Sequence, residues 1–250
     1  MKHLSPIMLA LTVSAGLMLV ACRQINFHQL AAIYAHARII FLLPIILTVI
    51  AELVLRALKW QLLLAPAGRV KVWDTFRLET AALALNNVLP LRLGEIVRGT
   101  YAADCFSMPL TTVLASIVAE KILDVVALLA LTAISANSAL PNLNPTCLPV
   151  CITIVLIIGV GYALFFRSGR LKDYPRLAMA VDNVALGFAS MGNRKTVANL
   201  FLLALTQWLF NSLGYYFIAQ SLGLGTHIGL VRSMAMAVTG ATASSIPGMP

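Results

Sequence analysis

The sequence predicts an all-α, polytopic helical membrane protein, because both its composition and the length of its apolar runs fit a chain surrounded by lipid. Hydrophobic residues make up 60% of the 250 residues and charged residues only 11%. A soluble domain has about 25% charged residues. Mean hydropathy is +0.90. Several runs reach the roughly 20 residues that a helix needs to cross a bilayer, so we expect about five full spans plus re-entrant segments. We expect them to form a single integral membrane domain over residues 1–250.

Charge and cysteine content exclude other classes. A net charge of +9 in so apolar a chain indicates basic cytoplasmic loops and contact with anionic headgroups, and we expect no nucleic-acid partner. The cysteines Cys22, Cys105, Cys147 and Cys151 form no paired framework. Cys147 and Cys151 are four residues apart, but no histidine or carboxylate lies nearby to complete a metal shell. We expect neither a metal nor a cofactor.

The first elements are an N-terminal span and a connector. The apolar run Leu4 to Ala21 is interpreted as an uncleaved span with a cytoplasmic N-terminus, although its end at Cys22 also resembles a lipoprotein cleavage site. Gln24 to Arg38 alternates apolar and polar residues at helical spacing, which indicates an interfacial helix. A second span is predicted from Ile39 to Leu64.

Charged residues crowd the second half of that span. Glu52 and Arg56 are spaced i, i+4, so we expect them to form an ion pair near the interface, with a lining role for a polar site as the alternative. Lys59 follows on the same helix, and basic residues continue beyond it at Arg69 and Lys71. This end is therefore predicted to be cytoplasmic.

Thr75 to Tyr101 is too interrupted to be one plain span. Asn87 and Pro90 follow an apolar stretch, Pro90 removes a backbone donor, and Gly94 tolerates an unusual backbone. We therefore predict a re-entrant pair of half-helices, which survives at membrane depth only inside protein or against a wet cavity. The ends of half-helices present free N–H groups that attract phosphates and carboxylates.

A third full span is predicted from Leu110 to Ala133, and it carries Glu120, Lys121 and Asp124. Lys121 can reach Asp124 at i, i+3 spacing. Glu120 then needs another partner, for which Arg92 and Arg98 are the candidates. The resulting network either only fastens the half-helices to the span or also handles a ligand.

The rest of the chain continues the pattern. We predict a span at 146–166, an amphipathic cytoplasmic helix at 177–195, a further span at 198–222 and a second re-entrant segment at 231–250. The last segment loosely resembles the stretch around Pro90, but it is predicted to enter the membrane from the outer side, whereas the stretch around Pro90 enters from the cytoplasmic side. An inverted repeat would produce this pattern.

These residues resemble the lysylphosphatidylglycerol synthase transmembrane-domain family, a flippase-like membrane module. The resemblance is carried by Leu55-Arg56-Ala57-Leu58-Lys59-Trp60, by the string from Asn87 to Arg98, by Glu120-Lys121-Ile122-Leu123-Asp124 and by Ile246-Pro247-Gly248. Two departures stand out. Lys121 occupies a position where the family usually has arginine, and the Gly-rich, Glu-containing continuation expected after Pro250 is missing. The second departure predicts a chain truncated at its C-terminus.

The resemblance implies a plasma or inner membrane module that binds and translocates a lipid with an anionic, aminoacylated or isoprenoid-linked headgroup. Arg92 and Arg98 would hold the headgroup phosphate, while Glu95, Glu120 and Asp124 would balance charge and engage an ammonium group. The substrate-binding residues expected on this basis are Asn87, Pro90, Arg92, Gly94, Glu95, Arg98, Glu120, Lys121 and Asp124.

Two other classes of function remain open. The chain has no room for the soluble aminoacyl-transferase domain of the synthases, so an enzyme would have to use Glu95 or Asp124 as an intramembrane acid or base. No nucleophile, base and orienting group stand together in the sequence. The other class is an accessory or scaffold subunit that works with enzymes of envelope-lipid synthesis.

Overall fold

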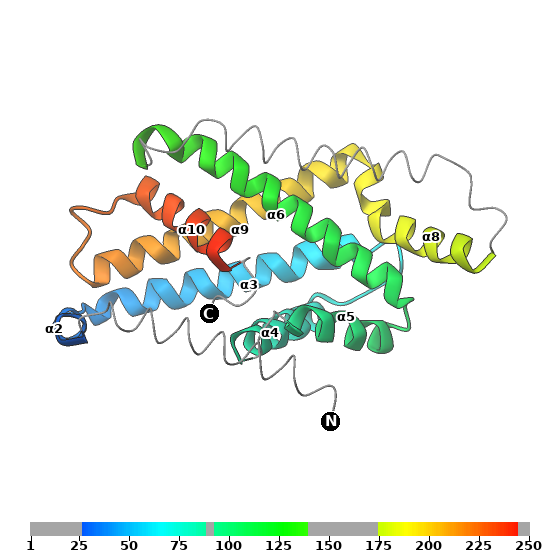
Figure 1. Cartoon of the computed structure of the whole chain (residues 1–250), viewed down its shortest axis with the longest axis horizontal. Helices are drawn as coiled ribbons and strands as arrows, with labels where there is room; N and C mark the ends of the chain where they lie inside the picture. Colours follow the sequence, from blue (N-terminus) through cyan, green and yellow to red (C-terminus); the bar gives the residue numbers. More distant parts are fainter. Residues whose placement is uncertain (1–26, 89–92, 140–174, 245–250) are drawn as a thin grey trace, which may run out of the picture.

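Two long, apolar helices lie side by side and antiparallel (Figure 1). The computed structural model describes residues 27–88, 93–139 and 175–244. Helix α3 (Leu42–Leu64) continues from a short 3-10 turn, η1 (Ile39–Phe41), and pairs with α9 (Arg194–Ser221). Within the described residues, the two helices long and apolar enough to cross a membrane are Ile39–Leu64, with a hydropathy of 2.5, and Arg194–Ser221, with 1.3. Both coincide with predicted spans.

Helices α6 and α10 pack against this pair. Helix α6 (Leu110–Ala139) extends beyond the predicted end at Ala133 and contacts both α3 and α9. Helix α10 (Leu230–Ser244) packs on α6 and α9. Every element in the described ranges is a helix, which confirms the all-α class.

Two shorter helices flank the break predicted near Pro90. Helix α4 (Val72–Val88) packs against α3, and α5 (Leu93–Phe106) packs against both α4 and α6. The helix, break and helix pattern of Thr75 to Tyr101 is thus present, although the break itself, 89–92, lies outside the described residues. Whether this pair is re-entrant in a membrane, and whether it has an inverted counterpart near α10, remain predictions.

The prediction for 177–195 needs correction. Helix α8 (Pro175–Phe188) ends earlier, a 3-10 turn η3 (Ala189–Gly192) follows, and Arg194 already begins α9. The reason is a cap: the Asn193 side chain accepts a hydrogen bond from the Lys195 backbone N–H at 3.0 Å and starts the new helix there. The predicted connector Gln24 to Arg38 contains α2 (Phe27–Ala35). The predicted spans at 4–21 and 146–166 lie outside the described residues.

The surface of α3 fits a lipid environment. Large apolar side chains are exposed in η1, at Ile39 (82%) and Ile40 (78%), and in the first half of α3, at Leu43 and Leu47. A soluble protein rarely leaves such a contiguous patch in water. The second half of α3 holds most of the buried residues of the helix, with Trp60 in an apolar core shared with α5, α6 and α9. The polar residues discussed below lie in that buried half.

Gly94 sets the distance between α4 and α5. A Cβ at this position would lie 2.3 Å from the carbonyl oxygen of Ala82, a backbone atom that cannot move away alone. Gly99 is a useful contrast, because a Cβ there meets the flexible tip of Leu114 at 2.9 Å. We expect Gly94→Ala to destabilise the protein by about 1–3 kcal/mol through overpacking.

This difference is measurable by thermal unfolding in detergent, with Gly99→Ala as the matched control. Gly94→Ala should lower the midpoint clearly and Gly99→Ala should lower it less. Equal midpoints for the two variants would mean that α4 and α5 do not approach closely at Gly94.

Candidate functional site

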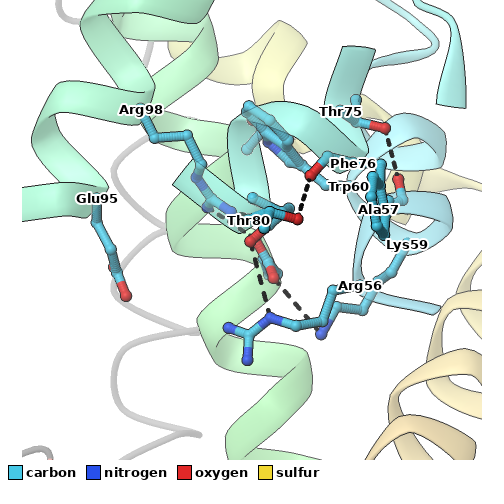
Figure 2. Close-up of polar contacts among 12 residues, drawn as sticks. Arg56, Ala57, Lys59, Trp60, Thr75, Phe76, Thr80, Glu95 and Arg98 are labelled. Atoms are coloured by element: carbon cyan, nitrogen blue, oxygen red, sulfur yellow. Dashed lines mark hydrogen bonds and ion pairs between the residues drawn. The ribbon is translucent and has the colours of Figure 1, made fainter. Parts of the chain in front are cut away.

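Arg98 is the residue that joins the short helices to the bundle. It projects from α5 toward α4 and the Trp60 ring (Figure 2). One terminal nitrogen donates to Glu79 of α4, and the other donates to Glu120 Oε2 of α6 at 2.9 Å. Its guanidinium lies 4.3 Å from the centroid of the Trp60 ring. A planar, permanently charged fork suits this combination of carboxylate pairs and aromatic stacking.

Lys59 brings the central helices into the same network. Its Nζ donates to Asp124 Oδ1 of α6 and, at 2.7 Å, to Gln207 Oε1 of α9. It also lies 3.6 Å from Glu120 Oε1. The Lys59 and Glu120 side chains are both 0% exposed. Glu120 is therefore held between a lysine of α3 and an arginine of α5.

Arg56 extends the network toward the middle of α3. Its Nε lies 3.7 Å from Glu79 Oε2, and its Nη1 lies 3.7 Å from Glu52 Oε1, which confirms the predicted Glu52 and Arg56 pair. Asn211 of α9 donates to Glu52 Oε2 at 3.0 Å. We call the connected set the ionic cluster; its charged members are Glu52, Arg56, Lys59, Glu79, Arg98, Glu120 and Asp124.

Two tryptophans shield the cluster and fix its geometry. Trp60 is fully buried and donates from Nε1 to Ser116 Oγ at 3.1 Å. Trp208 donates from Nε1 to Asp124 Oδ1 at 3.3 Å. Because these side chains are buried, each charge is stabilised by its ion-pair partner and not by solvent. Removal of one partner from a buried pair costs about 3–5 kcal/mol.

The cluster retains unused polar capacity. Within the described residues, Arg56 Nε, Arg98 Nε, Glu120 Oε1 and Gln207 Nε2 are buried without a hydrogen-bond partner. Its four acids, Glu52, Glu79, Glu120 and Asp124, face three bases, Arg56, Lys59 and Arg98. The described cluster therefore has one more acid than it has bases.

The structure brings together three of the predicted site residues, Arg98, Glu120 and Asp124, and confirms that Arg98 pairs with Glu120. The predicted pair of Lys121 and Asp124 is wrong. Lys121 Nζ lies 2.7 Å from Glu95 Oε1 and binds α5, whereas Asp124 faces Lys59. Consecutive residues of an α-helix point in directions about 100° apart, so Lys121 lies on a more exposed face of α6 than Glu120 does. Glu95 points away from the Arg98 contacts (Figure 2).

The other predicted site residues have different positions. Gly94 is buried against α4 and acts through packing. Asn87 belongs to the last turn of α4, and its side chain is not among those described. Pro90 and Arg92 lie outside the described residues.

Sequence reasoning assigned no site role to Lys59, Glu79 or Gln207. A signal for Lys59 existed, because Glu52, Arg56 and Lys59 are spaced i, i+4, i+7 and thus share one face of α3. Glu79 and Gln207 are polar residues inside apolar helices, which is a weaker signal. Their partners come from other helices, so only the packing identifies them.

A groove between α4 and α5 lies against the cluster. It has a volume of about 670 Å³, and Arg98 is part of its wall. The groove thus shares one buried side chain with the ionic cluster. In the described part of the chain, no group of three or more histidines, cysteines or carboxylates is arranged to hold a metal ion.

The class of the protein follows from a helical, apolar fold with a charged cluster at its centre: it is a membrane domain. The chain belongs to the family described as the lysylphosphatidylglycerol synthase TM region, which it matches over residues 7–250. No curated protein and no solved structure matches the chain.

The buried pairs make a stability prediction. Lys59→Met leaves Glu120 short of a cation and Asp124 with only its contact to Trp208, so we expect a loss of about 3–5 kcal/mol. Lys121→Met removes a pair whose side chains are 36% and 26% exposed. Such a pair contributes about 0–1 kcal/mol.

Denaturant or thermal unfolding of the purified protein checks this difference. A second substitution, Asp124→Leu, in the Lys59→Met background should restore part of the stability, because it removes the stranded charge. Equal effects of the two lysine substitutions would show that Lys59 is solvated and that the cluster is not dry.

Proposed function

We propose that this chain is a flippase-like module that binds the polar headgroup of a phospholipid and moves it across the membrane. The observation that carries the proposal is the ionic cluster, which unites α3, α4, α5, α6 and α9 inside an apolar protein. A charged residue at the centre of a membrane helix costs about 2.5–3.5 kcal/mol on insertion scales, so such residues usually mark a path or a site.

The cluster has groups for both ends of a headgroup. Arg98 would interact with the phosphate, and Arg92 is proposed as its companion on the basis of the family resemblance. Glu120 and Asp124 would engage an ammonium group such as that of an aminoacylated lipid, and the excess of acids over bases supports this role. Alternating exposure of the site would carry the headgroup through protein while the acyl chains stay in lipid.

The charge distribution supports a location in the plasma or inner membrane as a multi-pass protein with a cytoplasmic N-terminus. Ser190, just before α9, donates to the Leu62 carbonyl oxygen at 2.8 Å, so the C-terminal end of α3 and the N-terminal end of α9 lie together. Basic residues gather at this end: Arg69, Lys71, Arg194 and Lys195. Basic loops favour the cytoplasmic side.

The test is transbilayer movement of a labelled phospholipid in liposomes that contain the purified chain. We expect Glu120→Gln to slow this movement by about tenfold or more, equivalent to about 1.4 kcal/mol in a barrier, because it removes the charge that Arg98 and Lys59 share. Arg69→Gln is the control and should keep a rate close to that of the wild type, since Arg69 is exposed and does not belong to the ionic cluster.

Helix content and monodispersity in detergent must match the wild type before rates are compared. Asp124→Asn provides a second substitution of similar size within the cluster. Wild-type rates in both folded cluster variants would contradict the proposed site. No movement with folded wild-type protein would favour an accessory role alongside envelope-lipid enzymes.

A further inference from the structure

We infer that the groove between α4 and α5 is a docking site for one membrane phospholipid, with the phosphate at the Arg77 end and an acyl chain along the remaining groove. The inference deepens the proposed function and rests on it, because it identifies where the lipid meets the protein before its headgroup reaches the ionic cluster. No feature of the sequence alone indicates this groove, since its walls come from opposite sides of the break at 89–92.

The size of the groove fits an organic ligand. About 670 Å³ falls within the roughly 300–1,000 Å³ of typical small-molecule sites. A single water occupies only about 30 Å³, so an inorganic ion alone would leave most of the space unfilled. From Asp74 to Leu85 the wall formed by α4 rises about 16 Å at about 1.5 Å per residue. That length accommodates a headgroup and the adjoining part of a chain.

One end of the groove is suited to a phosphate. Asp74, Arg77 and Tyr101 line the groove, and Arg77 is exposed with its guanidinium 5.1 Å from the centroid of the Trp73 ring. Trp73 is 57% exposed and Tyr101 is 59% exposed. Such aromatic residues prefer the headgroup level of a bilayer. Stacking orders the arginine while leaving its donors available to a phosphate.

The other part of the groove is suited to a hydrocarbon chain. Its walls are Leu78, Ala81, Ala82 and Leu85 of α4 and Val97 of α5. The alanines leave the space that larger side chains would fill. Val97 is 42% exposed and its neighbour Ile96 is 57% exposed, so the outer face of α5 is apolar as well. An acyl chain in this part of the groove would contact apolar side chains and would bury no polar group without a partner.

Arg98 connects the groove to the ionic cluster. Its side chain is only 2% exposed, it lines the groove, and its Nε is buried without a hydrogen-bond partner in the described part of the chain. This unused donor belongs to a residue of the groove wall other than Arg77. A lipid in the groove would therefore meet the same arginine that binds Glu79 and Glu120.

Cys105 provides a direct reporter, because it lines the groove and is exposed. The variant carries Cys22→Ser, Cys147→Ser and Cys151→Ser, so that Cys105 is the only thiol left. The rate of maleimide labelling is measured in maltoside detergent with added phosphatidylglycerol, with diacylglycerol of the same chains, or with free glycerol phosphate. The comparison distinguishes binding of the whole phospholipid from binding of its apolar part, diacylglycerol, or its polar part, glycerol phosphate.

We expect phosphatidylglycerol to slow labelling by about fivefold at four times its dissociation constant, as simple occupancy requires. Diacylglycerol and glycerol phosphate should protect far less at the same concentration. Arg77→Gln should abolish the protection, whereas Arg69→Gln, an exposed arginine outside the groove, should preserve it. Both substitutions are at exposed sites, so folding should be retained.

Absence of protection in every arm would overturn the docking site, as would full protection of Arg77→Gln. Equal protection by glycerol phosphate would show a site for free phosphate esters and would also overturn it. Liposome assays separate this result from the proposed function. Protection without any lipid movement supports docking while removing the flippase proposal, and movement without protection removes docking alone.

Discussion

The constraint on which the structure depends is the complete burial of the Glu120 side chain. A fully buried carboxylate is stable only if the protein supplies its partners, and here those partners come from Lys59 of α3 and Arg98 of α5. Each partner in turn holds another acid, Asp124 or Glu79. The charges therefore fix the relative positions of α3, α4, α5 and α6 more specifically than apolar contacts alone would.

Meeting this constraint requires α5 to come close to its neighbours. Gly94 allows the start of α5 to lie against the Ala82 backbone, and Gly99 leaves space for Leu114 of α6. A larger residue at position 94 would push α5 away from α4, the helix that carries Glu79. Trp60 then covers the guanidinium and keeps the contact dry. Small residues on α5 and a large aromatic residue on α3 thus serve the same ionic contact.

The same arrangement provides a physical connection between the groove and the buried ionic cluster. The break between α4 and α5 produces two helices with a groove between them, and Arg98 belongs to both the groove and the cluster. In the proposed mechanism, a headgroup in the groove would compete for the donors of Arg98 and thereby affect Glu79 and Glu120. Proposed docking and proposed translocation are linked through this residue.

The sequence by itself determined the all-α class, the apolar helices near Ile39 to Leu64 and 198–222, and the interruption near Pro90, and it limited the candidate partners of Glu120 to Arg92 and Arg98, of which the structure shows Arg98. These features depend on composition, helical spacing and the high cost of an unpaired buried charge. Only the tertiary structure decided that Asp124 pairs with Lys59 and that Lys121 pairs with Glu95. Helical spacing gives the face on which a residue lies, but not which neighbouring helix covers that face. The groove could not be predicted from the sequence for the same reason, because its two walls come together only when α4 and α5 pack.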